Sequence, residues 1–104
     1  MDKRFIKNIS GKDFILFEGL LSLFHENNGS EIYTKILHKE NGMIIVQATV
    51  KGEKGVYQGI GDSCKDNVST MIYPHRVRMA ETRAIARALR LYNNIGMCSV
   101  EELN

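Results

Sequence analysis

The dipeptide Asn41-Gly42 restricts the fold of this 104-residue chain more than any other feature. Asn-Gly between two β-like runs is the strongest short-range signal for a two-residue hairpin, because both residues accept a positive φ. The run before it, Ile32 to Lys39, alternates in polarity, and the run after it, Met43 to Lys51, is rich in Ile and Val. The dipeptide therefore predicts an antiparallel hairpin of two strands.

The alternation also assigns residues to the two faces of these strands. One face of the first strand carries Ile32, Thr34 and Ile36, and its other face carries Tyr33, Lys35 and Lys39. A common face of the second strand carries Ile44, Val46, Ala48 and Val50. After a second turn, at residues 52–55, Val56 to Gly61 predicts a third strand. Its glycines, Gly59 and Gly61, are typical of a bend or of a close approach by another backbone. The three strands predict an antiparallel meander.

Helical periodicity flanks the meander on both sides. A first helix is expected from an N-cap at Ser10 or Asp13 to a stop at about Asn27, with its apolar stripe at Phe14, Phe17, Leu20, Leu21 and Phe24. The longest helix is expected from Pro74, whose missing N–H costs nothing at that position, to about Tyr92.

Shorter segments complete the predicted order. Residues 4–9 predict a short strand or an extended arm, residues 62–73 a loop with one helical turn, and residues 99–103 a capped final turn. The fold class is α+β, with a helix, a three-stranded antiparallel β-meander and a long C-terminal helix packed on the sheet, which gives a β-β-β-α core.

The bulk composition is that of one globular domain over residues 1–104. Hydrophobic residues make up 43% of the chain, and the net charge is only +2. No segment reaches the length of a membrane span, and the start of the chain lacks the apolar run of a signal peptide. Cys64 and Cys98 stand alone, without the spacing of a zinc site or a disulfide framework. We expect a cytoplasmic protein with reduced thiols and no membrane partner.

Positive charge is concentrated in the last helix. Residues 74–92 hold five arginines and one glutamate, a net charge of +4, so the rest of the chain sums to −2. At about 100° per residue, four of the arginines fall within about 60° of one another on the helical wheel: Arg76, Arg83, Arg87 and Arg90. A different face carries the residues expected to pack on the sheet: Val77, Ala84, Ile85, Ala88 and Leu91.

Such a stripe of like charges needs an anion beside it. A phosphate backbone is one such partner, and arginine suits it through bidentate, permanently charged contacts. Carboxylates from elsewhere in the chain are the alternative, although Glu81, the one acid within the helix, lies away from the stripe. The stripe favours nucleic acid without being specific for it.

Several motifs around this helix follow a known pattern. They are Gly59-Ile60-Gly61-Asp62, then Ala80-Glu81-Thr82-Arg83-Ala84 and Arg87-Ala88-Leu89-Arg90 within the helix, then Asn94-Ile95-Gly96. The chain resembles the RAD-fifty-two-type single-strand annealing proteins and their phage relatives, in which a β-β-β-α unit ends in an A-x-T-x-A-x-x-R-A-L-R-like helix followed by a glycine. The resemblance is best over residues 55–97.

The resemblance implies a homo-oligomer, often a ring, that binds single-stranded DNA in a groove between hairpin and helix, in phage or bacterial recombination and DNA repair. RNA is an alternative to DNA, and strand annealing is an extension of binding. Mapped onto this chain, the helix contributes Arg76, Arg83, Arg87 and Arg90. The hairpin contributes Lys35, Lys39, Lys51 and Lys54.

No catalytic or cofactor motif is legible. The histidines, His25, His38 and His75, share no metal-ligand spacing, and Gly59-Ile60-Gly61 lacks the further glycine of a dinucleotide fingerprint. Tyr57, Tyr73 and Tyr92 fit stacking on bases or packing in a core equally well. We therefore expect a non-enzyme without cofactor or metal. The alternative function is a small phage-type interaction protein or inhibitor that docks on an acidic groove of a host nucleic-acid enzyme.

Overall fold

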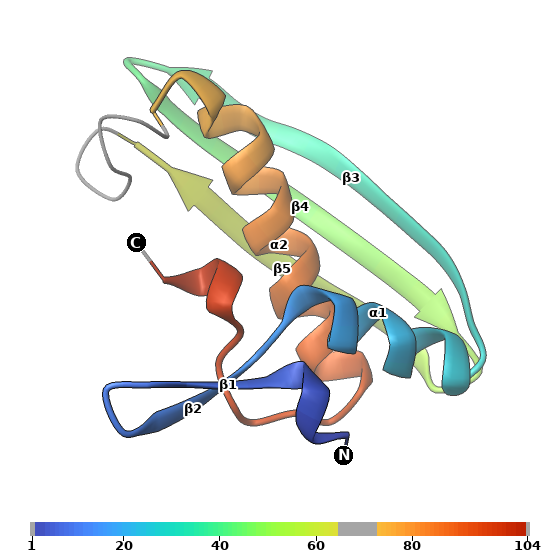
Figure 1. Cartoon of the computed structure of the whole chain (residues 1–104). Coiled ribbons are helices and arrows are strands. Elements are labelled where there is room, and N and C mark those ends of the chain that lie inside the picture. Colours follow the sequence, from blue (N-terminus) through green and yellow to red (C-terminus); the bar gives the residue numbers. More distant parts are fainter. Residues whose placement is uncertain (1, 65–72, 104) are drawn as a thin grey trace.

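The computed structural model describes residues 2–64 and 73–103, and its centre is a three-stranded sheet covered on one face by a long helix (Figure 1). The strands β3 (Gly29–Glu40), β4 (Met43–Gly52) and β5 (Gly55–Ser63) are antiparallel and lie in the order β3-β4-β5. The helix α2 (Arg76–Tyr92) follows β5 in the chain and packs mainly over β4 and β5. The predicted α+β class and the β-β-β-α core are confirmed.

The predicted turns and faces of the sheet are also confirmed. Asn41 and Gly42 have φ values of 54° and 74°, the positive values of a type I′ hairpin turn. The helix-facing residues of β4 are fully buried: Ile44, Val46, Ala48 and Val50. They supply the sheet side of the hydrophobic core.

Two glycines of β5 set the distance between the sheet and α2. A Cβ placed on Gly59 would lie 2.5 Å from the backbone nitrogen of Ala88, and one on Gly61 would collide with the backbone of Ala80 and Ala84. The face of α2 that contacts these glycines carries alanines, so the two backbones approach more closely than larger side chains would allow. The predicted close approach at these glycines is confirmed.

The first helix, α1 (Phe17–Glu26), packs across the C-terminal end of α2 (Figure 1). The Phe24 ring meets the Tyr92 ring edge to face, with 5.0 Å between centroids. The buried Tyr92 hydroxyl donates to the Asn27 carbonyl oxygen at 2.8 Å, just where α1 ends. Tyr92 is therefore a core residue that joins the two helices, which decides against base stacking for this tyrosine.

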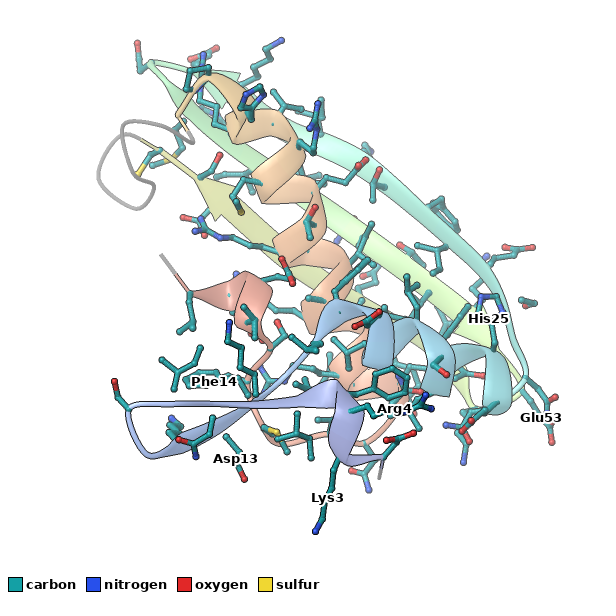
Figure 2. The ribbon with its side chains drawn as sticks, viewed as in Figure 1. Lys3, Arg4, Asp13, Phe14, His25 and Glu53 are labelled. Atoms are coloured by element: carbon teal, nitrogen blue, oxygen red, sulfur yellow. The ribbon has the colours of Figure 1, made fainter. Side chains whose placement is uncertain are left out.

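The prediction for residues 10–16 is wrong, because they form a hairpin instead of the start of a helix. Strand β1 (Ile6–Ile9) pairs with β2 (Lys12–Ile15) through a turn at Ser10 and Gly11, whose φ values are 53° and 84°. The predicted N-caps do not form: Ser10 lies in the turn, where it and Gly11 adopt the positive φ of a two-residue hairpin turn, and Asp13 lies on β2. Phe14 consequently lies buried on β2, and Figure 2 shows this strand with its side chains.

The helical wheel also misplaced two residues of α2. Val77 and Leu91 were expected on the sheet but are 38% and 56% exposed. The close contact with Gly59 and Gly61 turns the alanine row of α2 toward the sheet, and this rotation carries the larger side chains outward. The expected start at Pro74 is two residues early, since Tyr73–His75 forms a 3-10 turn, η2, ahead of α2. Most of the expected loop over residues 62–73 lies outside the described residues.

After α2 the chain folds back along the helix. It runs beside β2, where the Ile15 N–H donates to the Cys98 carbonyl oxygen at 2.9 Å. It ends in a 3-10 turn, η3 (Val100–Glu102), with Ser99 as N-cap and a capping box formed with Glu102. The predicted capped final turn is confirmed, and its place against α2 determines the surroundings of the arginines. A further 3-10 turn, η1 (Lys3–Phe5), begins the chain.

Candidate nucleic-acid interface

The five arginines of α2 form two groups with different surroundings. Arg83, Arg87 and Arg90 lie on the side of the helix that faces the C-terminal segment, residues 95–103. Arg76 and Arg78 lie in the first turn, next to η2. We call the first group the covered arginines.

Arg83 is the most deeply placed of the covered arginines, with 3% of its surface exposed. Its guanidinium donates to the carbonyl oxygen of Asp62 at 2.9 Å, of Leu103 at 3.2 Å and of Glu101 at 3.3 Å. Burial lowers the pKa of Arg83, yet the guanidinium stays charged, since arginine does not deprotonate in proteins. Arg83 thus ties the end of β5 and the C-terminal segment to α2.

Arg87 and Arg90 share one carboxylate. The Oε1 atom of Glu102 accepts from Arg90 at 2.7 Å and from Arg87 at 3.3 Å. Arg87 also donates to the Ile60 carbonyl oxygen at 2.8 Å, and Arg90 donates to the Gly96 carbonyl oxygen at 2.8 Å. Both guanidinium groups therefore have anionic or carbonyl partners within the chain.

Glu102 is also fixed by hydrogen bonds within its own turn. Its Oε2 atom accepts from the Ser99 N–H at 2.7 Å and from the Ser99 hydroxyl at 2.8 Å. Burial alone would raise the pKa of Glu102, but the hydrogen bonds from Ser99, together with Arg90, lower it below its ordinary value. The result is a fixed carboxylate that remains charged beside two arginines.

This arrangement corrects the predicted groove for the covered arginines. The stripe does have an anion beside it, but the anion is Glu102 of the same chain, which was not among the predicted site residues. The serine and glutamate of the predicted final turn were its only signal in the sequence. Arg83 was expected to line an open groove and is instead buried. Replacing Arg83 by glutamate would therefore disrupt the fold and would not test binding.

The start of α2 is different, because two of its basic side chains, His75 and Arg78, border open hollows, whereas Arg76 is half-buried. A hollow of about 380 Å³ lies on the side of β3 and is lined by Pro74, His75, Val77, Arg78 and Glu81. A second, of about 200 Å³, lies toward η3 and is lined by His75, Arg78, Met79, Thr82 and Glu101. His75 and Arg78 line both hollows, so Arg78 stands between them.

Lys39 is the predicted hairpin residue nearest to this end of α2. The register places Lys39, Ile44 and Ser63 in one row across the sheet, and the Ser63 hydroxyl donates to the Arg76 carbonyl oxygen. Two strand spacings of about 4.8 Å separate Lys39 from Ser63 along this row. Lys35 is exposed, but it lies in the row of Gln47 on the opposite face of the sheet.

The remaining two lysines do not join this end of the molecule. Lys51 lies 3.9 Å from the Glu31 carboxylate and 5.3 Å from the centre of the Tyr33 ring. Lys54 lies in the β4–β5 turn, where its N–H donates to the Tyr92 hydroxyl at 3.3 Å. The eight predicted residues are therefore spread over two faces and both ends of the sheet, and Arg76 and Lys39 are the two at the end where α2 begins.

The histidines, acids and cysteines of the described residues do not gather into a metal site. Residues 2–64 and 73–103 contain no group of three His, Cys, Asp or Glu side chains that could hold a metal ion. His25 lies at the end of α1 beside the β4–β5 turn (Figure 2), far from His75 at the start of α2. Within the same ranges, no helix is long and apolar enough to cross a membrane. Tyr57 packs against the Tyr92 ring at 5.9 Å.

Comparisons with protein-family models, with curated proteins and with solved structures returned no match. The surroundings of the side chains therefore carry the functional argument.

Proposed function

We propose that the protein binds single-stranded nucleic acid at the start of α2, in the hollow on the β3 side of this helix. Arg78 is the central residue and His75 lines the same hollow, while Arg76 in the same helical turn and Lys39 on β3 extend the basic surface. The interface then lies away from the covered arginines and includes two of the residues predicted from the sequence, Arg76 and Lys39.

The exposed guanidinium of Arg78 is the observation that carries the proposal. None of the described residues forms a hydrogen bond or ion pair with this guanidinium, whereas the covered arginines each have several partners. An unpaired arginine beside a hollow is free to make bidentate contacts with a phosphate.

The helix itself adds to the positive potential at this end. The first turn of α2 carries no acidic residue, and its N–H groups add the positive end of the helix dipole. Two carboxylates border the hollows. Glu81 is engaged by the Thr34 hydroxyl at 2.8 Å, and Glu101 lies on the far side of Arg78. Each hollow thus has one carboxylate in its lining, and Arg78, which lines both, is the side chain that a phosphate would contact.

The preference for single strands and for DNA rests on the resemblance over residues 55–97 to the RAD-fifty-two-type annealing proteins. The homo-oligomer, the ring and strand annealing have the same basis and stay predictions. A role in recombination requires strand annealing in addition to binding. Annealing would be measured by energy transfer between two complementary labelled oligonucleotides.

The test is fluorescence anisotropy with a labelled poly-dT oligonucleotide at low salt. We expect measurable binding that weakens steeply as salt rises, because each neutralised phosphate releases counterions. Arg78→Glu should weaken binding at least about tenfold, since it removes one phosphate contact and adds a repulsive charge.

Lys12→Glu is the matched control. It makes the same change of charge at an exposed position on β2, away from the hollows. We expect it to bind within about twofold of the parent, as a change in net charge alone would predict. Equal loss in both variants would refute a local site at Arg78. No binding by the parent at low salt would refute nucleic-acid binding and would favour the alternative of a protein partner.

A further inference from the structure

The two edges of the sheet, β5 and β3, differ in whether their outward backbone groups have hydrogen-bond partners. In an antiparallel ladder closed by a two-residue turn, alternate residues of an edge strand direct their N–H and C=O groups outward. On β5 these include Ile60 and Asp62, and their carbonyl oxygens accept from Arg87 at 2.8 Å and from Arg83 at 2.9 Å. Arg83 and Arg87 thus occupy the outward carbonyl oxygens of the last part of β5, which opposes the addition of a further strand there.

The edge of β3 has no such cap. The same alternation directs the backbone groups of Ile32, Thr34 and Ile36 outward. Among the described residues, none outside β4 makes a backbone hydrogen bond to β3. Ile36 and Leu37 are 49% and 48% exposed at this edge, and the strand runs along one side of the molecule in Figure 1. A long open edge is a template for pairing with another strand.

We propose that the edge of β3 binds a second copy of this chain, in a twofold dimer in which two β3 strands pair antiparallel about Tyr33. The product is a continuous six-stranded sheet with α2 of each copy on the same face. Because Arg83 and Arg87 occupy part of the β5 edge, pairing of β3 with β5 of another copy is disfavoured, and β3 pairing with β3 uses the open edge of both copies.

Charge complementarity selects the register. In a pairing centred on Tyr33, Glu31 of one copy faces Lys35 of the other, and the contact occurs twice because of the symmetry. Both side chains lie on the face of the sheet that α2 leaves uncovered, as the register with Lys51 and Gln47 shows. On the helix side, Ile32 faces Thr34 of the other copy. Each position therefore meets a compatible partner.

The irregularities of β3 fit the same register. The register with β4 shifts between Gly29 and Glu31 and again between Ile36 and His38, so the regular stretch runs from Glu31 to Ile36. A bulge twists an edge away from a partner, which limits pairing to the residues between the shifts. The proposed pairs, Glu31 with Lys35 and Ile32 with Thr34, all lie inside this stretch.

Thr34→Pro tests the use of the edge. Its N–H points outward and is not needed by β4, so proline should leave the fold intact, as circular dichroism would check, while removing hydrogen bonds to the second copy. We expect sedimentation velocity at micromolar concentration to give twice the 11.8 kDa of one chain for the parent and a monomer for the variant. A monomeric parent at 100 micromolar, or an assembly of equal mass in a folded variant, overturns the proposal.

A charge exchange tests the register without touching the backbone. Lys35→Glu places two carboxylates opposite each other at both symmetric contacts and should weaken the dimer roughly tenfold. Adding Glu31→Lys should restore the affinity to within about threefold, because the opposite charges then face each other again. Lys39→Glu, beyond the bulge, is the control and should change the dimer little. Failure of the exchange to restore the dimer contradicts this register.

Cross-linking tests the twofold centre directly. Two Tyr33 residues would face each other at a Cα separation of about 4.5 Å, within the range of a disulfide. Tyr33→Cys should therefore form a covalent dimer on mild oxidation. Lys35→Cys should not, since its two copies lie about four residues apart along the strands. The parent, which keeps Cys64 and Cys98, is oxidised in parallel. Equal cross-linking at both positions rejects the centre at Tyr33.

Discussion

Arg78 and Arg83 are five positions apart on α2, yet they occupy opposite environments. Arg78 is exposed and unpaired among the described residues, whereas Arg83 is buried and bound to three carbonyl oxygens. The difference arises from a segment distant in sequence, residues 95–103, which covers the side of the helix that carries Arg83 and leaves Arg78 exposed. Arginines of one helix can therefore stabilise the fold through hydrogen bonds at one position and remain available to a ligand at another.

Among the substitutions that test this contrast, Arg83→Met should lower the stability of the fold most. Methionine keeps the length of the side chain but removes the donors to the carbonyl oxygens of Asp62, Glu101 and Leu103, and with them the bonds that hold the C-terminal segment on α2. We expect the free energy of unfolding to fall by about 3 kcal/mol, measured by urea denaturation. A loss below about 1 kcal/mol would mean that the covered arginines do not fasten the C-terminal segment.

Glu102→Gln should have a smaller effect. It keeps the shape of the side chain and removes the charge that Arg87 and Arg90 share. We expect a loss of about 1.5 kcal/mol at pH 7, since hydrogen bonds between charged groups are worth more than neutral ones. Glu26→Gln, an exposed carboxylate at the end of α1, is the matched control and should change stability by less than about 0.5 kcal/mol.

The contribution of Glu102 should also depend on pH. Its pKa is lower in the folded protein than its ordinary value of 4.5, so the folded state favours the carboxylate. The resulting stabilisation is present above pH 4.5 and is lost as the pH falls through the folded pKa. We expect the stability difference between the parent and Glu102→Gln to be constant from pH 7 to about 5 and to shrink below 4.5. A difference that grows in acid would contradict this assignment.

Arg78→Met should have the smallest effect on stability, within about 0.5 kcal/mol, because its guanidinium has no partner to lose. Its effect should appear in binding instead. The slope of log K for poly-dT against log salt should fall by about 1, as expected for one lost phosphate contact. A large loss of stability would remove the contrast between Arg78 and Arg83.

The sheet and α2 could be predicted because their signals are local. Asn41-Gly42 determines the hairpin, and the period of two assigns the buried face of β4. The hairpin at residues 6–15 was missed because Ser10-Gly11 fits both a helix start and a tight turn, and only the partner strand distinguishes them. For Gly59 and Gly61 the sequence predicts a bend or a close approach of another backbone, and the structure shows the close approach.

The candidate site was harder to predict, because exposure depends on contacts that are distant in sequence. The wheel placed Arg83, Arg87 and Arg90 together, and the structure agrees. Their partner, Glu102, lies 12 to 15 residues beyond Arg87 and Arg90, and no periodicity links it to them. Arg78 was left out because it is off the stripe, which is also why the C-terminal segment does not reach it.

The close contact at Gly61 links steric fit to surface charge. Arg83 and Arg87 reach the carbonyl oxygens of Asp62 and Ile60 only because the backbone of α2 lies directly on β5. Gly61→Ala leaves the net charge unchanged, but its methyl group would push α2 away from β5. The guanidinium groups would then lose their acceptors and turn toward water. A single methyl group would thus expose the positive charges of Arg83 and Arg87 and free the carbonyl oxygens at the edge of β5.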